Sequence, residues 1–191
     1  PVHWCLHCET ALAEAELEYA DHESYSITVR FDLIWTPTRF NRVFPDLKNP
    51  KILIWTTTPW TLPANTAVAV NKNFDYVEVK IGDEQFILAK DLVQKVLTDE
   101  KHQPLNYQVI RELKGSELVG KSYEPLLGED RGENAHKVWH ADYVSSEDGS
   151  GIVHIAPAYG EEDFAMAKDK KIPVVHAIDE NGLYTETEWK G

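Results

Sequence analysis

Cysteine, positive charge and long apolar runs are all scarce in this sequence. Cys5 and Cys8 are the two cysteines among 191 residues, too few for a disulfide framework and consistent with a reducing, cytoplasmic compartment. No apolar run approaches the length of a membrane span, and no signal peptide opens the chain, so we expect no membrane partner. Because the chain begins with Pro1 and not with methionine, we interpret it as a piece of a longer protein.

The composition is otherwise that of an ordinary globular domain. Apolar residues make up 42% of the chain and charged residues 27%, and 191 residues suffice for one domain with a core. Lysine and arginine number 19 against 32 aspartates and glutamates, which gives a net charge of −13. This balance excludes a broad basic surface that grips nucleic-acid phosphates.

Two short apolar runs, 52–54 and 67–70, flank the segment WTTTPWTLPAN at 55–65. Its three adjacent threonines offer hydroxyls that both donate and accept hydrogen bonds. Its two prolines each remove a backbone donor and disfavour both central sheet and helix. We therefore predict a structured polar loop between two strands, a common position for binding and catalytic side chains. On the residues alone, a β-hairpin with its threonines on a solvated face is the alternative.

A second polar group of residues follows further along the chain. A turn at 148–151 leads into a short strand at 152–157 that contains His154 and ends at proline. A helix running to about Lys170 then carries three acidic residues in its first turn, where they suit the positive end of the helix dipole. On the residues alone, the alternative to a functional role is a buried structural histidine for His154 and a helix-terminus carboxylate for Asp163.

Alternating apolar and polar residues predict half-buried strands elsewhere. The predicted strands are 24–33, 51–55, 74–81, 84–89, 108–113 and 138–144; the predicted turns are 82–83 and 114–120; the predicted loops are 35–49 and 128–136; a helix is predicted over 90–97. Many short strands without regular strand–helix alternation predict a mainly β, barrel-like domain with peripheral helices.

The two polar motifs resemble the editing domain of isoleucyl-tRNA synthetase, a connective polypeptide insertion in the catalytic fold of this class I aminoacyl-tRNA synthetase. TTTPWTLPAN is similar to its threonine-rich peptide, whereas valyl and leucyl relatives typically read Thr-Thr-Arg-Pro; Thr58 stands at the position of that arginine. GSGIVHIAPAYGEEDF is similar to the second signature, G-x-G-x-V-H-x-A-P-x-x-G-x-x-D. The stretch 174–182 resembles the strand and turn that follow it in the family.

The resemblance implies a β-barrel-like editing domain of the valyl, isoleucyl and leucyl type. Residues 21–191 would form this domain, and residues 1–20 a connecting segment that contains the CxxC pair. The family also suggests that part of 9–18 is extended although its helix propensity is high, so we leave its conformation open. No HIGH or KMSKS-like motif occurs, so amino-acid activation would lie elsewhere in the longer protein.

The implied reaction is hydrolytic proofreading of valine misattached to tRNA(Ile), with valyl-adenylate as a second substrate. One methylene is worth only about 1–3 kcal/mol in a binding pocket, so a second site must remove the error. Asp163 would anchor the α-ammonium group by a charge-assisted bond, and the ring of His154 would exclude isoleucine. Thr56, Thr57 and Thr58 would position the terminal adenosine, the ester and the attacking water.

Further residues complete the predicted site. Asn65 matches a family position near the substrate, and Trp55 and Trp60 could wall the pocket. The predicted catalytic residues are Thr57, Thr58 and Asp163; the predicted substrate-binding residues are Trp55, Thr56, Asn65, His154 and Asp163. A triad with Thr57 as the nucleophile is disfavoured, because a threonine nucleophile needs an adjacent base. No cofactor is expected for editing.

The spacing of Cys5 and Cys8 supplies half of a tetrahedral zinc site. His3 and His7 are near, but four ligands so close in sequence would strain the backbone. Some bacterial isoleucyl-tRNA synthetases are similar, with one cysteine pair before the editing insertion and one after it. We therefore hypothesise a structural zinc half-site that is completed only in the full-length enzyme; two free thiols are the alternative.

The expected partners are the 3′ acceptor end of tRNA(Ile) carrying valine and the remainder of the synthetase, with the fragment itself monomeric. A charge of −13 is compatible with this only if the domain touches the single-stranded acceptor end, and the chain alone should then bind tRNA weakly. Two alternatives remain open: a valyl-type editing domain that clears threonine, and a non-catalytic module that guides the acceptor end.

Overall fold

The structure, a computed structural model, describes residues 2–21, 23, 25–34, 49–127 and 131–185. The strands are β1 (His3–Cys5), β2 (Thr10–Leu12), β3 (Ile27–Ile34), β4 (Lys51–Thr56), β5 (Ala67–Val70), β6 (Asp75–Ile81), β7 (Glu84–Ala89), β8 (Gln108–Lys114), β9 (Ser122–Tyr123), β10 (Lys137–His140) and β11 (Ile152–Ile155). The α-helices are α1 (Val93–Val96), α2 (Gly115–Leu118) and α3 (Glu161–Lys170), and the 3₁₀ helices are η1 (Glu14–Glu16), η3 (Pro59–Ala64) and η4 (Lys90–Leu92).

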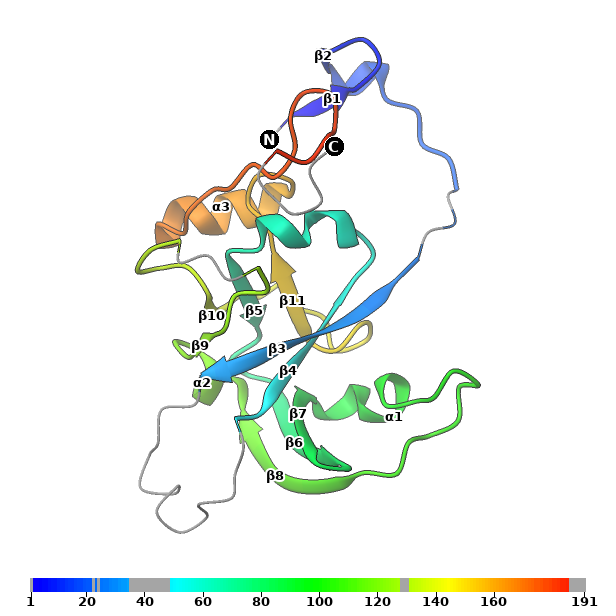
Figure 1. The fold of residues 1–191 in the computed structure, drawn as a ribbon, viewed down its shortest axis with the longest axis vertical. Helices are drawn as coiled ribbons and strands as arrows, with labels where there is room; N and C mark the ends of the chain where they lie inside the picture. The colour runs from blue at the N-terminus through cyan, green and yellow to red at the C-terminus, as the bar shows by residue number, and fades with distance from the viewer. Residues whose placement is uncertain (1, 22, 24, 35–48, 128–130, 186–191) are drawn as a thin grey trace.

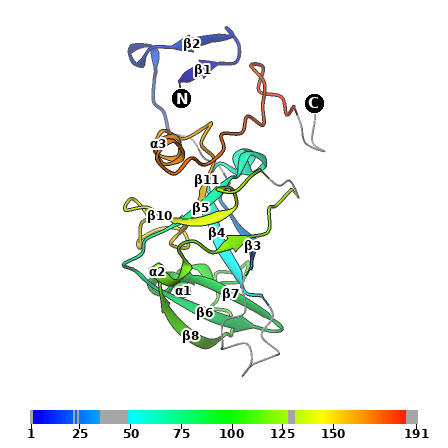
Figure 2. The same cartoon turned by 90° about the vertical axis from the view of Figure 1, so that its left-hand side faces the viewer.

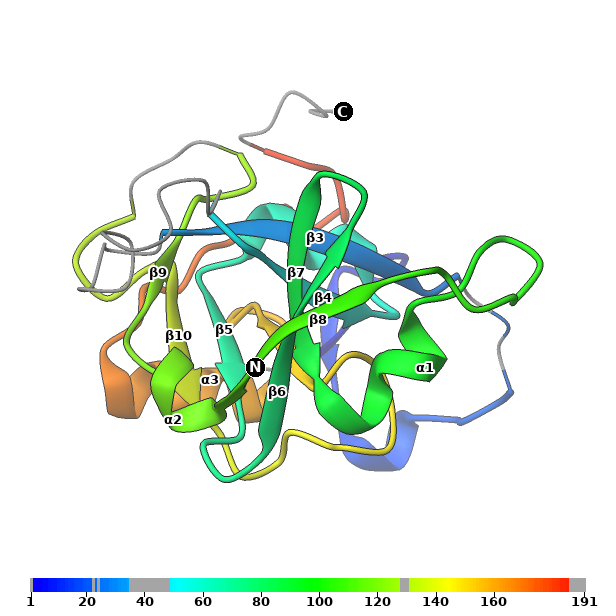
Figure 3. The ribbon, with the colours of Figure 1, turned by 90° about the horizontal axis from the view of Figure 1, so that it is seen from below.

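Nine of the described strands form one sheet in the order β11-β5-β10-β9-β3-β4-β7-β6-β8. An additional pairing between β11 and β4 closes the first six of these strands into a barrel (Figure 3). β7, β6 and β8 continue the sheet beyond the barrel, with β6 and β7 joined by the predicted tight turn at Gly82. The prediction of a mainly β, barrel-like fold with peripheral helices is confirmed.

The barrel interior is filled by side chains that alternate along the strands. Phe31 and Leu33 of β3, Ile52 and Ile54 of β4, and the valines of β5 belong to one buried cluster. The alanines of β5, Ala67 and Ala69, face the opposite way into a second cluster with Ala167 of α3. Small side chains on that face let the helix pack closely on the barrel.

The β1–β2 hairpin lies apart from the barrel, beside the segment 179–185 (Figures 1 and 2). The Trp4 indole nitrogen donates to the backbone oxygen of Glu180 at 2.9 Å, and a methyl group at Gly182 would lie 3.0 Å from Leu6. The cysteine pair is therefore remote from the barrel core. No described helix is both long and apolar enough to cross a membrane.

Local predictions differ from the structure where turns replace extended chain. The structured loop predicted over 55–65 contains the 3₁₀ helix η3, in which bonds such as Thr61 N–H to Thr58 C=O form although the two prolines lack backbone donors. The predicted turn at 114–120 contains the helical turn α2, and the predicted strand at 138–144 ends already at His140. In the stretch that resembles a family strand, Ile178 makes only an isolated bridge to Tyr184.

At the other end of the chain, β3 begins three residues later than predicted, and 9–18 contains β2 and η1. The extended conformation that the family suggests for part of 9–18 is thus confirmed by β2. Most of the predicted loop at 35–49 and part of that at 128–136 lie outside the described residues.

Gly151, directly before β11, tests how closely the turn that leads into this strand packs against the end of β7. Its φ is +73°, and an added methyl carbon would lie 2.3 Å from the Ala89 Cβ atom, whereas Gly82, at φ +59°, has nothing within 4 Å. We expect Gly151→Ala to lower the free energy of unfolding by about 2–4 kcal/mol, from backbone strain and overpacking together. Gly82→Ala should cost only the backbone strain, about 1 kcal/mol. Equal losses for both variants in denaturant titrations would contradict the close contact.

Candidate functional site

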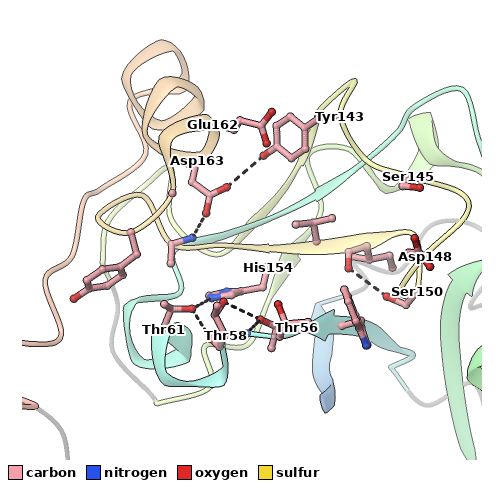
Figure 4. A pocket seen from close by; sticks show the side chains of 18 of the residues that line it. Thr56, Thr58, Thr61, Tyr143, Ser145, Asp148, Ser150, His154, Glu162 and Asp163 are labelled. Atoms are coloured by element: carbon pink, nitrogen blue, oxygen red, sulfur yellow. Dashed lines mark hydrogen bonds between the residues drawn. The ribbon is translucent and has the colours of Figure 1, made fainter. Parts of the chain in front are cut away.

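The two polar motifs meet at one edge of the barrel. β4 and β11 run parallel, with Val153 opposite Trp55, so their carboxyl ends lie side by side. The threonine segment follows β4 and the loop to α3 follows β11; together they surround a cavity of about 380 Å³ (Figure 4). The residues that line the cavity are Trp55–Thr58, Trp60, Thr61, Tyr143, Ser145, Asp148–His154, Ala156, Tyr159, Gly160, Glu162 and Asp163.

The threonine segment is held in shape by its own hydroxyls. Thr56 is buried, and its hydroxyl oxygen accepts the backbone N–H of Thr58 at 3.0 Å and lies 3.3 Å from the Thr58 hydroxyl. The side chains of Thr57 and Thr58 are exposed. The segment therefore presents hydroxyl groups to the cavity from a turn that is already formed.

His154 is the centre of a buried hydrogen-bond chain. Its Nδ1 atom lies 2.8 Å from the Asn65 amide nitrogen, and its Nε2 atom lies 2.9 Å from the Thr61 hydroxyl. The Asn65 amide nitrogen also donates to the Ala67 backbone oxygen at 2.8 Å, and Thr61 donates to the Thr58 backbone oxygen at 2.8 Å. Because an amide nitrogen only donates, Nδ1 must accept, and the neutral ring carries its proton on Nε2.

Burial keeps the His154 ring neutral. The side chain is 7% exposed, and desolvation lowers its pKa to about 4. Both ring nitrogens are also engaged in the chain just described, so neither has a free lone pair that could take a proton from a nucleophile. His154 is thus a fixed, uncharged wall of the cavity.

Asp163 lies in the first turn of α3 and points into the cavity (Figure 4). Its Oδ2 atom accepts the backbone N–H of Ala156 at 2.8 Å, and its Oδ1 atom lies 3.5 Å from the Tyr143 hydroxyl. Burial raises the pKa of this carboxyl group, and the N–H of Ala156 partly opposes the rise. A cationic ligand group at Oδ1 would relieve the cost of burying the charged form.

The geometry speaks against a nucleophilic triad. Asp163 bonds to Ala156 and not to His154, and the imidazole bonds to Asn65 and Thr61 and not to Thr57. A triad needs the base bonded to the nucleophile and oriented by the acid. The described contacts supply neither of these links.

Other predicted site residues have mixed positions. Trp55 lines the cavity and is 37% exposed; Trp60 also lines it and packs edge-to-face on Tyr159, with ring centroids 5.0 Å apart. Asn65, predicted to bind substrate, does not line the cavity: it is 4% exposed and lies behind His154. Its contact with the site passes through the imidazole ring.

Sequence reasoning missed Thr61 and Tyr143. Thr61 is part of the threonine segment, but its role depends on the turn of η3, which brings its hydroxyl to His154 across 93 positions of sequence. The sequence predicts Tyr143 within a strand, but β10 ends at His140, and Tyr143 reaches Asp163 from the loop that follows. Burial and the nearby carboxylates of Asp163 and Glu162 raise the pKa of Tyr143, so its hydroxyl stays protonated as a donor.

Acidic side chains dominate the charge of the cavity. Asp148, Glu162 and Asp163 line it, and none of its described lining residues is a lysine or arginine. The acidic side chains are therefore suited to a ligand group that carries a positive charge.

The cysteine pair does not form a complete metal site. Cys8 donates its backbone N–H to the Cys5 sulfur at 3.4 Å, and backbone N–H groups lower the pKa of Cys5. Within the described ranges, no group of three or more histidine, cysteine or acidic side chains could hold a metal ion. The pair offers two thiolates at most, so further ligands for zinc would have to come from outside the described chain.

A family model described as "Leucyl-tRNA synthetase, editing domain" matches residues 41–190. The chain therefore belongs to this family of aminoacyl-tRNA synthetase editing domains. Similar curated proteins are named isoleucine–tRNA ligase, the type that the two motifs resemble. An isoleucine–tRNA ligase of Kosmotoga olearia is 42% identical over 191 residues, and one of Methanocaldococcus jannaschii is 43% identical over 206; both comparisons cover the whole chain.

The chain spans 19% of the length of these relatives. Solved structures support the same fold. The crystal structure of GlLeuRS-CP1 superposes with a TM-score of 0.60 at 22% identity, covering 76% of this chain and 60% of that one. The editing domain of the P. knowlesi cytosolic leucyl-tRNA synthetase gives 0.57 at 15% identity, covering 80% and 66%.

The neutral state of His154 predicts a pH-dependent stability. Its pKa of about 4 in the folded chain lies below the ordinary 6.5, so the unfolded chain binds the proton first as pH falls. The free energy of unfolding should fall between pH 6.5 and 4, by about 3 kcal/mol from this residue. His154→Gln removes this contribution. The pKa of Asp163 is raised in the folded chain, so Asp163 changes the free energy of unfolding in the opposite direction, in the wild type and in His154→Gln alike. Parallel curves for both proteins in denaturant titrations at several pH values would disprove the assignment.

Proposed function

We propose that this chain is the proofreading part of a longer isoleucine–tRNA ligase and hydrolyses the ester of valine misattached to tRNA(Ile). The observation that carries the proposal is the convergence of Thr56–Thr58, His154 and Asp163 on one cavity from two strand ends. The names of the similar curated proteins support the choice of isoleucine. Valyl-adenylate, which carries the same aminoacyl group, would be a second substrate.

Asp163 is the ammonium anchor in this proposal. One of its oxygens is fixed by Ala156, which leaves Oδ1 to accept a charge-assisted bond from the α-ammonium group. An aminoacyl ester presents this cation without a free carboxylate, which matches the acidic lining of the cavity.

His154 is the size-selective wall. Its ring is held on both sides by hydrogen bonds, so it cannot swing aside for a larger side chain. The binding energies of isoleucine and valine differ by only about 1–3 kcal/mol, so a wall that moved aside for the larger side chain would lose the selectivity.

The nucleophile is water, positioned by the exposed hydroxyls of Thr57 and Thr58. The water oxygen forms a bond to the ester carbonyl carbon, the bond from that carbon to the ribose oxygen breaks, and a water proton passes to the ribose oxygen. Because His154 has no free lone pair, the vicinal ribose hydroxyl is the proton carrier that fits best. The role of the protein is then mainly orientation.

The acceptor end of tRNA(Ile) and the remainder of the ligase are the partners in this proposal, and the cytoplasm is the compartment. With a net charge of −13, the chain cannot hold tRNA phosphates tightly, so delivery of the 3′ end depends on the longer protein.

The proposal is tested by deacylation of preformed Val-tRNA(Ile) and Ile-tRNA(Ile), with this chain and with the longer ligase. We expect hydrolysis of the valyl ester alone, faster in the ligase. Asp163→Ala should slow it about ten- to a hundredfold, the worth of a charge-assisted bond. His154→Ala should raise hydrolysis of the isoleucyl ester by about tenfold or more.

Asp169→Ala is the matched control, because Asp169 is an exposed carboxylate on the same helix that pairs with Lys170. It should leave both rates unchanged. No hydrolysis by either protein would leave a module that only guides the acceptor end. Unchanged hydrolysis in Asp163→Ala would reject the anchor.

We also propose that Cys5 and Cys8 form half of a structural zinc site whose other ligands lie in the longer ligase. Metal analysis of the purified ligase should find zinc that Cys5→Ser removes and that His3→Ala leaves in place. A ligase whose zinc content is unaffected by Cys5→Ser would contain no such half-site.

A further inference from the structure

A chain of hydrogen bonds runs from a strand of the barrel to the cavity wall. It starts at the Tyr123 hydroxyl on β9, which donates to Asn65 Oδ1 at 2.5 Å, and continues through His154 and Thr61 to the Thr58 backbone oxygen. Apart from Thr58, every side chain in it is at most 7% exposed. Tyr123 does not line the cavity and belongs to no motif singled out in the sequence.

We propose that Tyr123 is a positioning residue of the editing site: its hydroxyl holds the Asn65 amide in the orientation that keeps the His154 proton on Nε2. The inference rests on the proposed function for its effect on selectivity, but the state of the imidazole ring can be measured independently. Tyr123 touches no substrate and acts only through Asn65 and His154.

The hydroxyl of Tyr123 has no packing role that a phenylalanine could not fill. The ring stacks edge-to-face on Phe31, with centroids 5.0 Å apart, and on His136 at 5.6 Å. A buried hydroxyl is costly unless it is bonded, and its recorded acceptor in the described chain is Asn65 Oδ1. Burial raises the pKa of Tyr123, so the proton stays on the hydroxyl and is available to donate.

The Asn65 amide has two orientations, and the two give opposite bonds to His154. In the observed one, the amide nitrogen faces both the Ala67 oxygen and Nδ1, and the amide oxygen receives the Tyr123 proton. Turned over, the amide oxygen would face Nδ1 and accept from it, and the proton of the ring would have to move from Nε2 to Nδ1.

Turning over the Asn65 amide would also change the hydrogen bonds at the cavity wall. With the proton on Nδ1, the Nε2 atom accepts from the Thr61 hydroxyl, which then no longer donates to the Thr58 backbone oxygen. The bond from the Thr61 hydroxyl to the Thr58 backbone oxygen is lost, which leaves the backbone bond from Thr61 N–H at 3.1 Å, and the imidazole wall loses its single defined state. Two groups oppose this change: the Ala67 backbone oxygen would face the amide oxygen, and the Tyr123 proton has an acceptor in the observed orientation only.

The test is Tyr123→Phe, which keeps the ring and removes the hydroxyl. In nitrogen-15 NMR spectra of the wild-type chain, His154 should show a protonated Nε2 and an unprotonated Nδ1. In Tyr123→Phe, a second state with the proton on Nδ1 should become populated. In deacylation assays, the rate for Ile-tRNA(Ile) relative to Val-tRNA(Ile) should rise about tenfold, the worth of one buried hydrogen bond.

Two further variants separate positioning from stability. Phe31→Leu removes a ring that packs on Tyr123 but leaves the hydrogen-bond chain intact, so it should destabilise the barrel without changing the His154 tautomer or the selectivity. Asn65→Asp replaces the amide donor by a carboxylate, so it should place a proton on Nδ1 and raise the pKa of His154.

A wild-type ring with its proton on Nδ1 would overturn the proposal. So would a Tyr123→Phe protein in which both the tautomer and the selectivity are those of the wild type, or in which Phe31→Leu changes them equally. If the wild type hydrolyses neither ester, the proposed function fails, whereas the tautomer in Tyr123→Phe still decides the role of Tyr123.

Discussion

The parallel contact between β4 and β11 is the constraint on which the site depends. Without it, the sheet would remain an open ribbon, and the threonine segment and α3 would begin at separated strand ends. With it, the barrel closes at Val153 and Trp55, and the segments that follow β4 and β11 both begin at the same edge of the barrel. The same pairing thus fixes both the architecture and the position of the site.

The sequence predicts the strands well where apolar and polar residues alternate without interruption, as in β6 and β7. The family resemblance of two motifs indicates Thr56–Thr58, His154 and Asp163, which line the cavity. Prediction from the sequence fails where the outcome depends on distant contacts. Asn65 is close in sequence to residues that line the cavity, but it follows η3 and lies on the side of His154 that faces away from the cavity. Thr61, Tyr123 and Tyr143 have hydrogen-bond partners that are distant in sequence, which no local pattern encodes.

The polar residues inside the barrel illustrate why a buried network can be useful although apolar packing would be at least as stable. Each polar group in the chain from Tyr123 to Thr58 has a hydrogen-bond partner. These bonds offset the cost of burying the groups, and every side chain in the chain is uncharged. The result is an imidazole ring with one orientation and one protonation state. In the proposed function, the site would have to distinguish side chains that differ by a single carbon, and a wall of defined shape serves that task better than a reactive group.

The acidic lining of the cavity has a consequence for turnover. Hydrolysis of an aminoacyl ester converts a neutral carbonyl group into a carboxylate while the ammonium group stays unchanged. The product would then carry a new negative charge beside Glu162 and Asp163, with no lysine or arginine among the described lining residues to receive it; Lys95, outside the lining, is paired with Asp148. Repulsion between like charges would drive the free amino acid out into solvent. The groups that admit the substrate would thereby also prevent inhibition by the amino acid that the cell contains in abundance.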